Sequence, residues 1–219
     1  MKGFRNKIRQ NKILRWSLLF SNWFFQGIWN SDITEKIYKL SFTSVFCVII
    51  FFLLELNPIG FRFFIAFLIA HTINWIINCP ITVILVHRLL LWQVQKKKIF
   101  NYLNNLKKRT EDSNCIAYCA VYGSIARGEL KGSSDIDVGF LRKPGFINAL
   151  KGLLFITLER IRANIWGIPL EGYLFDSIDK MSDRFRNEQI PIVLKQSDLI
   201  NVNCLSLEKA RELNSINRS

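Results

Sequence analysis

The chain has 219 residues, of which 50% are hydrophobic, and its 30 Lys/Arg against 17 Asp/Glu give a formal net charge of +13. This length accommodates one globular domain with an additional module. The charge distribution weighs against a nucleic-acid substrate, because residues 110–219 carry fourteen charges of each sign while the excess of Lys/Arg lies in residues 1–39 and 88–109.

Residues 1–39 form a basic segment that we expect to lie at a membrane surface. Between residues 13 and 30, Trp16, Trp23 and Trp29 are interspersed with polar side chains at roughly helical spacing. This pattern predicts an amphipathic helix with the aromatic content typical of membrane interfaces. The helix can either lie on the membrane or cross it. No small-residue cleavage site follows Trp29, which weighs against a signal peptide.

Residues 40–90 are predicted to form a transmembrane helical hairpin. Residues 40–54 are almost wholly apolar, a short turn containing Glu55 and Pro58 follows, and residues 63–86 contain no formal charge. A run of that length crosses a hydrocarbon core of about 30 Å. The alternative is a buried helical hairpin in a soluble core. Because both outer flanks are rich in Lys/Arg, the positive-inside rule predicts cytoplasmic termini in a multi-pass protein of the cell membrane.

The remaining residues are predicted to form a basic helical connector, 91–109, and an α/β domain, 110–219. The apolar pattern predicts strands over residues 116–121, 135–141 and 169–175, with helices over 146–163 and 206–213. Residues 125–129 form either a short helix or a turn. The expected fold class is therefore α/β, a small mixed sheet flanked by helices, preceded by the apolar hairpin.

The most informative stretch of the chain connects the first two predicted strands. An apolar run ends at Gly123-Ser124, and Asp135 and Asp137 then alternate with aliphatic residues. This alternation places both carboxylates on one face of a strand. Neighbouring carboxylates repel one another unless a cation lies between them, and hard divalent cations prefer such oxygens. The Gly-Ser turn offers backbone N–H groups and a hydroxyl to a phosphate, so the pattern indicates metal-assisted nucleotide transfer.

These motifs resemble the signature of the minimal nucleotidyltransferases of the DNA polymerase β superfamily. The resemblance rests on Gly-Ser-x-Ala-Arg-Gly over residues 123–128 and on Ser-Asp-Ile-Asp-Val over residues 134–138. The chain is also similar to membrane-attached members that carry Arg-Lys-Pro-Gly after the Asp strand, as residues 142–145 do, and Pro-Leu-acid on the third strand, as residues 169–171 do.

The resemblance implies that three carboxylates hold two Mg²⁺ ions, with Mn²⁺ as an alternative metal. Asp135 and Asp137 match the first two ligands. Glu171 is the better match for the third, with Asp176 as the alternative, although a Glu stands where many relatives have Asp. Glu171 would also orient or deprotonate the acceptor. The expected nucleotide-binding residues are Gly123, Ser124, Arg127, Lys131 and Arg142.

The expected reaction is transfer of a nucleoside monophosphate from a triphosphate, most simply ATP, to an acceptor hydroxyl at the cytoplasmic membrane face, with release of pyrophosphate. Location at the bilayer favours a lipid-linked glycan precursor, a phospholipid head group or a membrane protein as the acceptor. Two alternatives remain: a non-catalytic nucleotide-binding scaffold, and an antitoxin-like transferase that adenylylates a protein. Two spans in each chain are also compatible with an oligomer.

Overall fold

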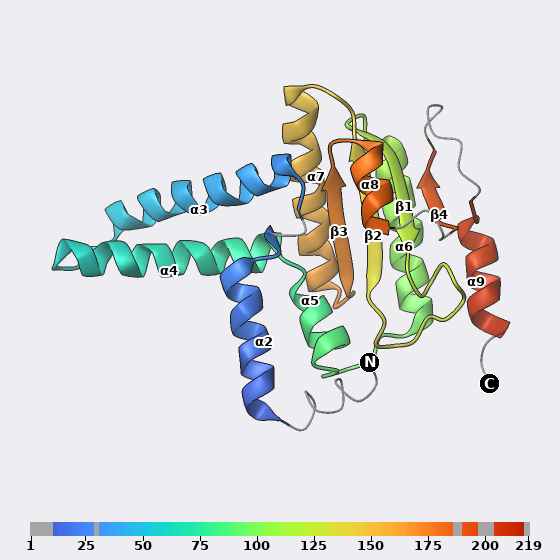
Figure 1. The fold of residues 1–219 in the computed structure, drawn as a ribbon, viewed down its shortest axis with the longest axis horizontal. Coiled ribbons are helices and arrows are strands. Elements are labelled where there is room, and N and C mark those ends of the chain that lie inside the picture. Colours follow the sequence, from blue (N-terminus) through green and yellow to red (C-terminus); the bar gives the residue numbers. More distant parts are fainter. Residues whose placement is uncertain (1–10, 29–30, 186–189, 197–203, 217–219) are drawn as a thin grey trace.

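A helical hairpin and an α/β domain make up the computed structural model, which describes residues 11–28, 31–185, 190–196 and 204–216. Helices α3 (Ile33–Leu53) and α4 (Ile59–Asn78) lie side by side and project away from the domain (Figure 1). The preceding helix α2 (Lys12–Phe25) runs across the hairpin axis at its base. Residues 1–10 and 29–30 of the predicted interfacial segment lie outside the described residues.

The domain contains a small mixed sheet, as the sequence predicts, but the sheet has four strands and the sequence predicted only the first three. Its strands lie in the order β3-β2-β1-β4, where β2 and β3 are parallel and β1 is antiparallel to both of its neighbours. Helix α7 (Phe146–Ile165) makes the crossover between the parallel pair. The strand bounds are β1 (Ile116–Tyr122), β2 (Ile136–Arg142), β3 (Leu170–Phe175) and β4 (Ile192–Lys195).

Alternation along the strands divides the apolar side chains between two cores. On one face, residues such as Val121 and Val138 pack with α6 (Lys96–Asp112) and α7 in the larger core. On the other face, a smaller aromatic core including Tyr118 and Tyr173 packs against α8 (Ile178–Phe185). The last helix, α9 (Leu207–Ile216), packs beside β4.

Residues 91–109 are part of the domain and do not form a separate connector. The side chains of Ile99, Leu103 and Leu106 on α6 are fully buried in the larger core. Their spacing places them on one helix face, and the sheet covers that face. The structural domain therefore begins before residue 110.

The second apolar run is shorter as a helix than the sequence predicts. Helix α4 ends at Asn78, and Pro80 precedes the short helix α5 (Ile81–Val83) and a π-helical turn, η2 (Ile84–Arg88). Proline disfavours a helical conformation in the residue before it, which accounts for the break. Beyond Pro80 the chain enters the domain, where Val86 is fully buried.

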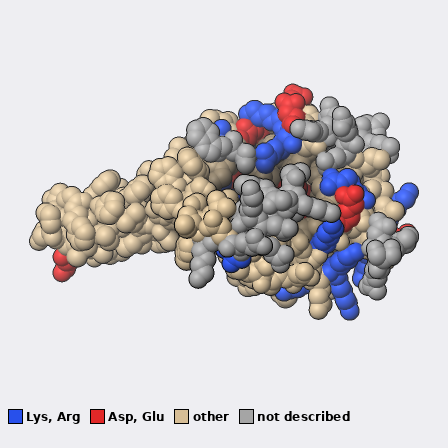
Figure 2. Space-filling model, turned by 60° about the horizontal axis from the view of Figure 1, so that its bottom comes forward, with Lys and Arg blue, Asp and Glu red and all other residues tan. Residues whose placement is uncertain are grey.

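The hairpin helices have the length and composition of membrane spans. Both are long and apolar enough to cross a bilayer, and only 11% and 17% of the residues in their most apolar stretches are buried. A helix buried in a soluble core would instead be covered by its own domain. In Figure 2 the projecting arm is almost entirely free of charged residues, which gather on the domain.

Candidate functional site

A tight turn follows β1 and forms one wall of the site. Gly123 has a φ of +83°, and a Cβ at this position would lie 2.8 Å from Oδ2 of Asp137. Only glycine combines this backbone conformation with so close an approach. Residues 124–128 form turns, and the Glu129 N–H donates to the Ser124 carbonyl over 2.8 Å. Of the short helix and the turn that the sequence left open for residues 125–129, the structure therefore shows the turn.

Three carboxylates meet on the sheet face beside this turn. Asp135, Asp137 and Glu171 can each offer an oxygen such that all three ligand atoms lie within 4.8 Å of one another. Asp137 and Glu171 are paired in register on the parallel strands β2 and β3, which brings together residues 34 positions apart. The structure thus assembles the three carboxylates that the sequence singled out.

The three carboxylates are close enough together that they could hold a cation. Burial raises the pKa of Asp137 from 3.8 to about 7, and the negative charges of Asp135 and Glu171 contribute to that rise. A divalent ion among the three oxygens would remove the repulsion. Because the three side chains supply only carboxylate oxygens, the set fits Mg²⁺ or Mn²⁺.

Glu171 is held in place by residues that sequence reasoning missed. The Tyr173 hydroxyl donates a short hydrogen bond to Oε1 of Glu171, and Arg184 of α8 donates to that hydroxyl over 2.6 Å. Burial, followed by the negative charge of Glu171, raises the pKa of Tyr173, so the phenol remains a proton donor. Tyr173 lies two residues beyond Glu171 on one strand face, a signal present in the sequence, whereas Arg184 reaches the site through the packing of α8.

His87 is a second unexpected member of the site. It lies on η2, and its Nε2 is 3.5 Å from Oδ2 of Asp135. Its Nδ1 is 2.8 Å from the Ser133 carbonyl, which accepts a hydrogen bond from the ring, while Nε2 faces the carboxylate. The sequence assigned this histidine to the hairpin region, and only the return of the chain after Pro80 brings it to the site.

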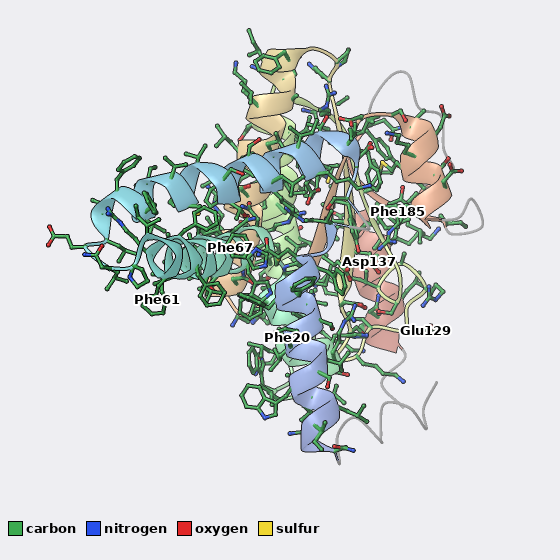
Figure 3. All side chains as sticks on the ribbon, turned by 60° about the vertical axis from the view of Figure 1, so that its left-hand side comes forward. Phe20, Phe61, Phe67, Glu129, Asp137 and Phe185 are labelled. Atoms are coloured by element: carbon green, nitrogen blue, oxygen red, sulfur yellow. The ribbon has the colours of Figure 1, made fainter. Side chains whose placement is uncertain are left out.

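Asp135 and Asp137 line a cavity of about 840 Å³, whereas Glu171 is not among its lining residues. This volume lies within the range of small-molecule sites. Figure 3 shows Asp137, Glu129 and Phe185 on the domain, well away from Phe61 on the hairpin. The cavity is lined by His87, Lys96, Tyr122, Gly123, Ser124, Arg127, Gly128, Glu129, Leu130, Lys131, Ser134, Asp135, Asp137, Arg184 and Phe185.

Four of the five predicted nucleotide-binding residues line this cavity. Among the described residues, the buried Oγ of Ser124 has no hydrogen-bond partner. Buried hydroxyls are usually hydrogen-bonded, so this one can bond to a ligand in the cavity. Arg127 pairs with Glu129 over 3.1 Å at a largely exposed position, and Lys131 lies on the loop before Asp135. Gly123 provides the close backbone approach.

Arg142 does not belong to the site. It lies at the far end of β2, five residues or about 16 Å from Asp137 along the strand. There its Nε donates to Oδ1 of Asp176 over 2.6 Å, and the Thr34 hydroxyl donates to the same carboxylate over 2.6 Å. Asp176, the alternative third ligand, therefore joins the domain to the start of α3 and does not face the other two carboxylates.

Comparison with known proteins adds no family assignment. No protein-family model matches the chain, and no curated protein is found to be similar to it. Any assignment of function therefore depends on the site itself.

Proposed function

We propose that the protein is a metal-dependent nucleotidyltransferase held at the membrane by its hairpin. The observation that supports the proposal is that Asp135, Asp137 and Glu171 lie together, and that Asp135 and Asp137 line one cavity with the Gly123-Ser124 turn. A carboxylate cluster alone would indicate only a cation site. The cluster lies beside a tight Gly-Ser turn that can bind a phosphate and beside the unpartnered Ser124 hydroxyl. This combination favours a metal–triphosphate complex as the ligand.

Each residue has a specific part in this proposal. Asp135, Asp137 and Glu171 hold the cations, while Gly123 and Ser124 bind the phosphates of the nucleotide. Two divalent cations would supply charge neutralisation for the triphosphate and stabilisation of the leaving pyrophosphate. Arg127 and Lys131 reach the phosphates from the cavity rim. Tyr173 and Arg184 position Glu171.

The reaction is a displacement at the α-phosphorus of a nucleoside triphosphate, most simply ATP. The acceptor hydroxyl oxygen forms a new P–O bond, the bond to the β-phosphate oxygen breaks, and pyrophosphate leaves. Glu171 takes the hydroxyl proton and passes it to solvent. The products are the nucleotidylated acceptor and pyrophosphate.

The hairpin supports an acceptor at the membrane. Helices α3 and α4, of 21 and 20 residues, measure about 30 Å each, which matches the hydrocarbon core of a bilayer. The basic flanks favour cytoplasmic termini and a cytoplasmic domain, where ATP is present. A lipid-linked or membrane-protein hydroxyl is therefore a better acceptor than a nucleic acid.

One assay separates catalysis from nucleotide binding alone. Membranes containing the full chain are incubated with Mg²⁺ and with α-labelled or γ-labelled ATP, beside an Asp135→Asn/Asp137→Asn variant. We expect transfer of the α-label only, and its loss in the double variant. Asp179→Asn, at an exposed position on α8, is the matched control and retains transfer. Organic extraction and a protein gel then distinguish a lipid from a protein acceptor.

Two other outcomes of this assay would contradict parts of the proposal. If ATP binds but no label leaves it, the chain is a nucleotide-binding scaffold and the enzymatic proposal fails. If the label appears on a soluble protein, the antitoxin-like alternative replaces a membrane acceptor.

A further inference from the structure

Helix α7 carries a row of exposed apolar side chains that its packing against the sheet does not explain. Ile147, Leu150, Leu154 and Leu158 are 46–66% exposed, and their spacing of three or four residues places them on one face. On the opposite face, Leu153 and other buried side chains of α7 pack into the larger core. A helix in water is normally polar on the face that the core does not use.

The row is part of a larger apolar surface. Phe146 and Ile165, near the two ends of α7, are both 77% exposed. Single exposed apolar residues are common on soluble proteins, but a continuous surface along a whole helix marks an interaction site. We call the surface formed by Phe146, Ile147, Leu150, Leu154, Leu158 and Ile165 the α7 row.

The α7 row adjoins the apolar surface of the hairpin. The Thr157 hydroxyl donates to Oδ1 of Asn78 over 2.9 Å, so α7 holds the end of α4. At about 100° per residue, Leu154 and Leu158 lie about 60° and 100° around the helix from Thr157. In Figure 1, α7 extends past α3 across the hairpin axis. A bilayer that surrounds the hairpin would therefore meet the adjacent side of α7.

The charges on α7 suit an anionic lipid surface. Lys151 is exposed, and the Arg162 side chain is 42% exposed and pairs over 2.5 Å with Glu159, the only acidic residue of the helix, which is fully buried. At about 100° per residue, Lys151 and Arg162 lie about 40° and 60° around the helix from Ile147, so both lie along one border of the α7 row. Basic residues beside an apolar face are typical of a helix that lies in the interface plane. Both the apolar and the charged residues of α7 thus fit the surface of an anionic bilayer.

We infer that α7 docks on the bilayer surface through the α7 row, beside the point where the hairpin enters. The inference rests on the part of the proposed function that places the hairpin in a membrane. Helix α2 carries a comparable exposed row at the hairpin base, which includes Ile13, Trp16 and Phe20. With α2 and α7 both docked, the domain cannot rotate freely about the hairpin, and the cavity keeps a constant orientation toward acceptors in the bilayer.

The test measures whether each labelled position is exposed to lipid or to water. In a Cys204→Ser background, single cysteines replace Leu154 or Leu158, and a small fluorophore is attached. Cys204 is replaced because it is exposed, whereas the other four cysteines are buried. The full chain is placed in nanodiscs of zwitterionic and anionic phospholipid. Quenching by a spin-labelled lipid is compared with quenching by aqueous iodide. Ile69 on α4 is the membrane reference and Asp183 on α8 is the aqueous reference.

We expect labels at 154 and 158 to be quenched several-fold more by the lipid, and several-fold less by iodide, than the label at Asp183. If they behave like Asp183 while Ile69 is lipid-quenched, the α7 inference fails and the spanning hairpin stands. If Ile69 is also reached by iodide, the hairpin does not span and both proposals about the membrane fail. Shielding of 154 and 158 from both quenchers would show that a protein, such as a second copy, covers the row, and would also overturn the inference.

A second variant separates docking from folding. A label at Leu150 is measured in the presence of Leu154→Glu and Leu158→Glu. We expect lipid quenching of that label to fall several-fold, while the thermal unfolding temperature in detergent stays unchanged because both positions are exposed. Unchanged lipid quenching would contradict the inference.

Discussion

Asp137 has the most constrained surroundings of any single side chain in the site. The Gly123 backbone lies against one of its oxygens, Glu171 is its partner in the parallel register, and Asp135 lies two residues away. Three negative charges in a partly buried position are unfavourable without a cation. The same feature that indicates metal binding should therefore reduce the stability of the metal-free protein.

We expect the stability of the metal-free protein to depend on the protonation of Asp137. Its pKa is 3.8 when exposed and about 7 in the folded chain. Between these values the folded state binds a proton that the unfolded state has lost, so this group's contribution to the free energy of unfolding falls as pH rises from about 4 to about 7. Mg²⁺ binds the ionised form, so its stabilising effect should grow over the same window.

Unfolding in detergent at a series of pH values, with EDTA or with Mg²⁺, measures both effects. The Asp137→Asn variant in EDTA should have a flatter pH profile than the natural chain. Asp183→Asn, which changes an exposed carboxyl of α8, should leave the profile unchanged. An identical pH slope in Asp137→Asn and the natural chain would show that Asp137 is not the titrating group.

At the scale of the elements, a buried ionic cluster joins the hairpin to the domain. Glu35 of α3 lies between Lys39, at 2.8 Å, and Arg160 of α7, at 2.6 Å, and all three side chains are buried. Arg160 also donates to the Gly172 carbonyl over 2.7 Å, next to Glu171 on β3. The base of the hairpin is thus linked, through Arg160 of α7, to the strand that carries a proposed metal ligand.

Replacement of Glu35 by Gln should destabilise the protein strongly. It would leave two buried cations without their carboxylate, a change that costs about 3–5 kcal/mol when a buried pair is broken. Glu111→Gln is the matched control, because Glu111 and Lys107 form a 3.9 Å pair with both side chains nearly half exposed. That control should change stability by less than about 1 kcal/mol. Denaturant unfolding in detergent measures both, and equal small effects would refute a structural role for the cluster.

At the scale of the whole molecule, charge and apolar surface are separated in space. Beyond the buried cluster at its base, the projecting arm of α3 and α4 is nearly free of charge, and the charged residues gather on the domain (Figure 2). This separation is expected when one part of a chain is solvated by lipid and the other by water. It predicts a definite sidedness for the turn between α3 and α4.

Cysteine accessibility in cells tests that sidedness. In the Cys204→Ser background, a membrane-impermeant maleimide should label Glu55→Cys, in the hairpin turn, from outside intact cells. It should label Asp179→Cys, in the domain, only after the membrane is permeabilised. Both native positions are exposed in the structure, so access depends on topology alone. Labelling of both from outside, or of neither, would contradict cytoplasmic termini.

The elements that follow from local pattern were predicted well. Alternation of apolar residues located β1, β2 and β3 to within one residue at each end, and the α7 helix to within two residues at its C-terminus. The length of α4 was overestimated. A run of apolar residues can be buried in lipid or in a protein core, and the count of apolar residues is the same in both cases. Pro80 was the local signal for that boundary.

Local pattern is enough to predict the Gly123-Ser124 turn, the paired Asp135 and Asp137 and the apolar character of the hairpin, because these features depend on neighbours within a few residues. The three-dimensional fold is needed to show that Glu171 joins the two aspartates, that Arg142 binds Asp176 instead of the cavity, and that His87 and Arg184 enter the site. Those outcomes depend on strand register and helix packing, which bring together side chains that no short-range pattern connects.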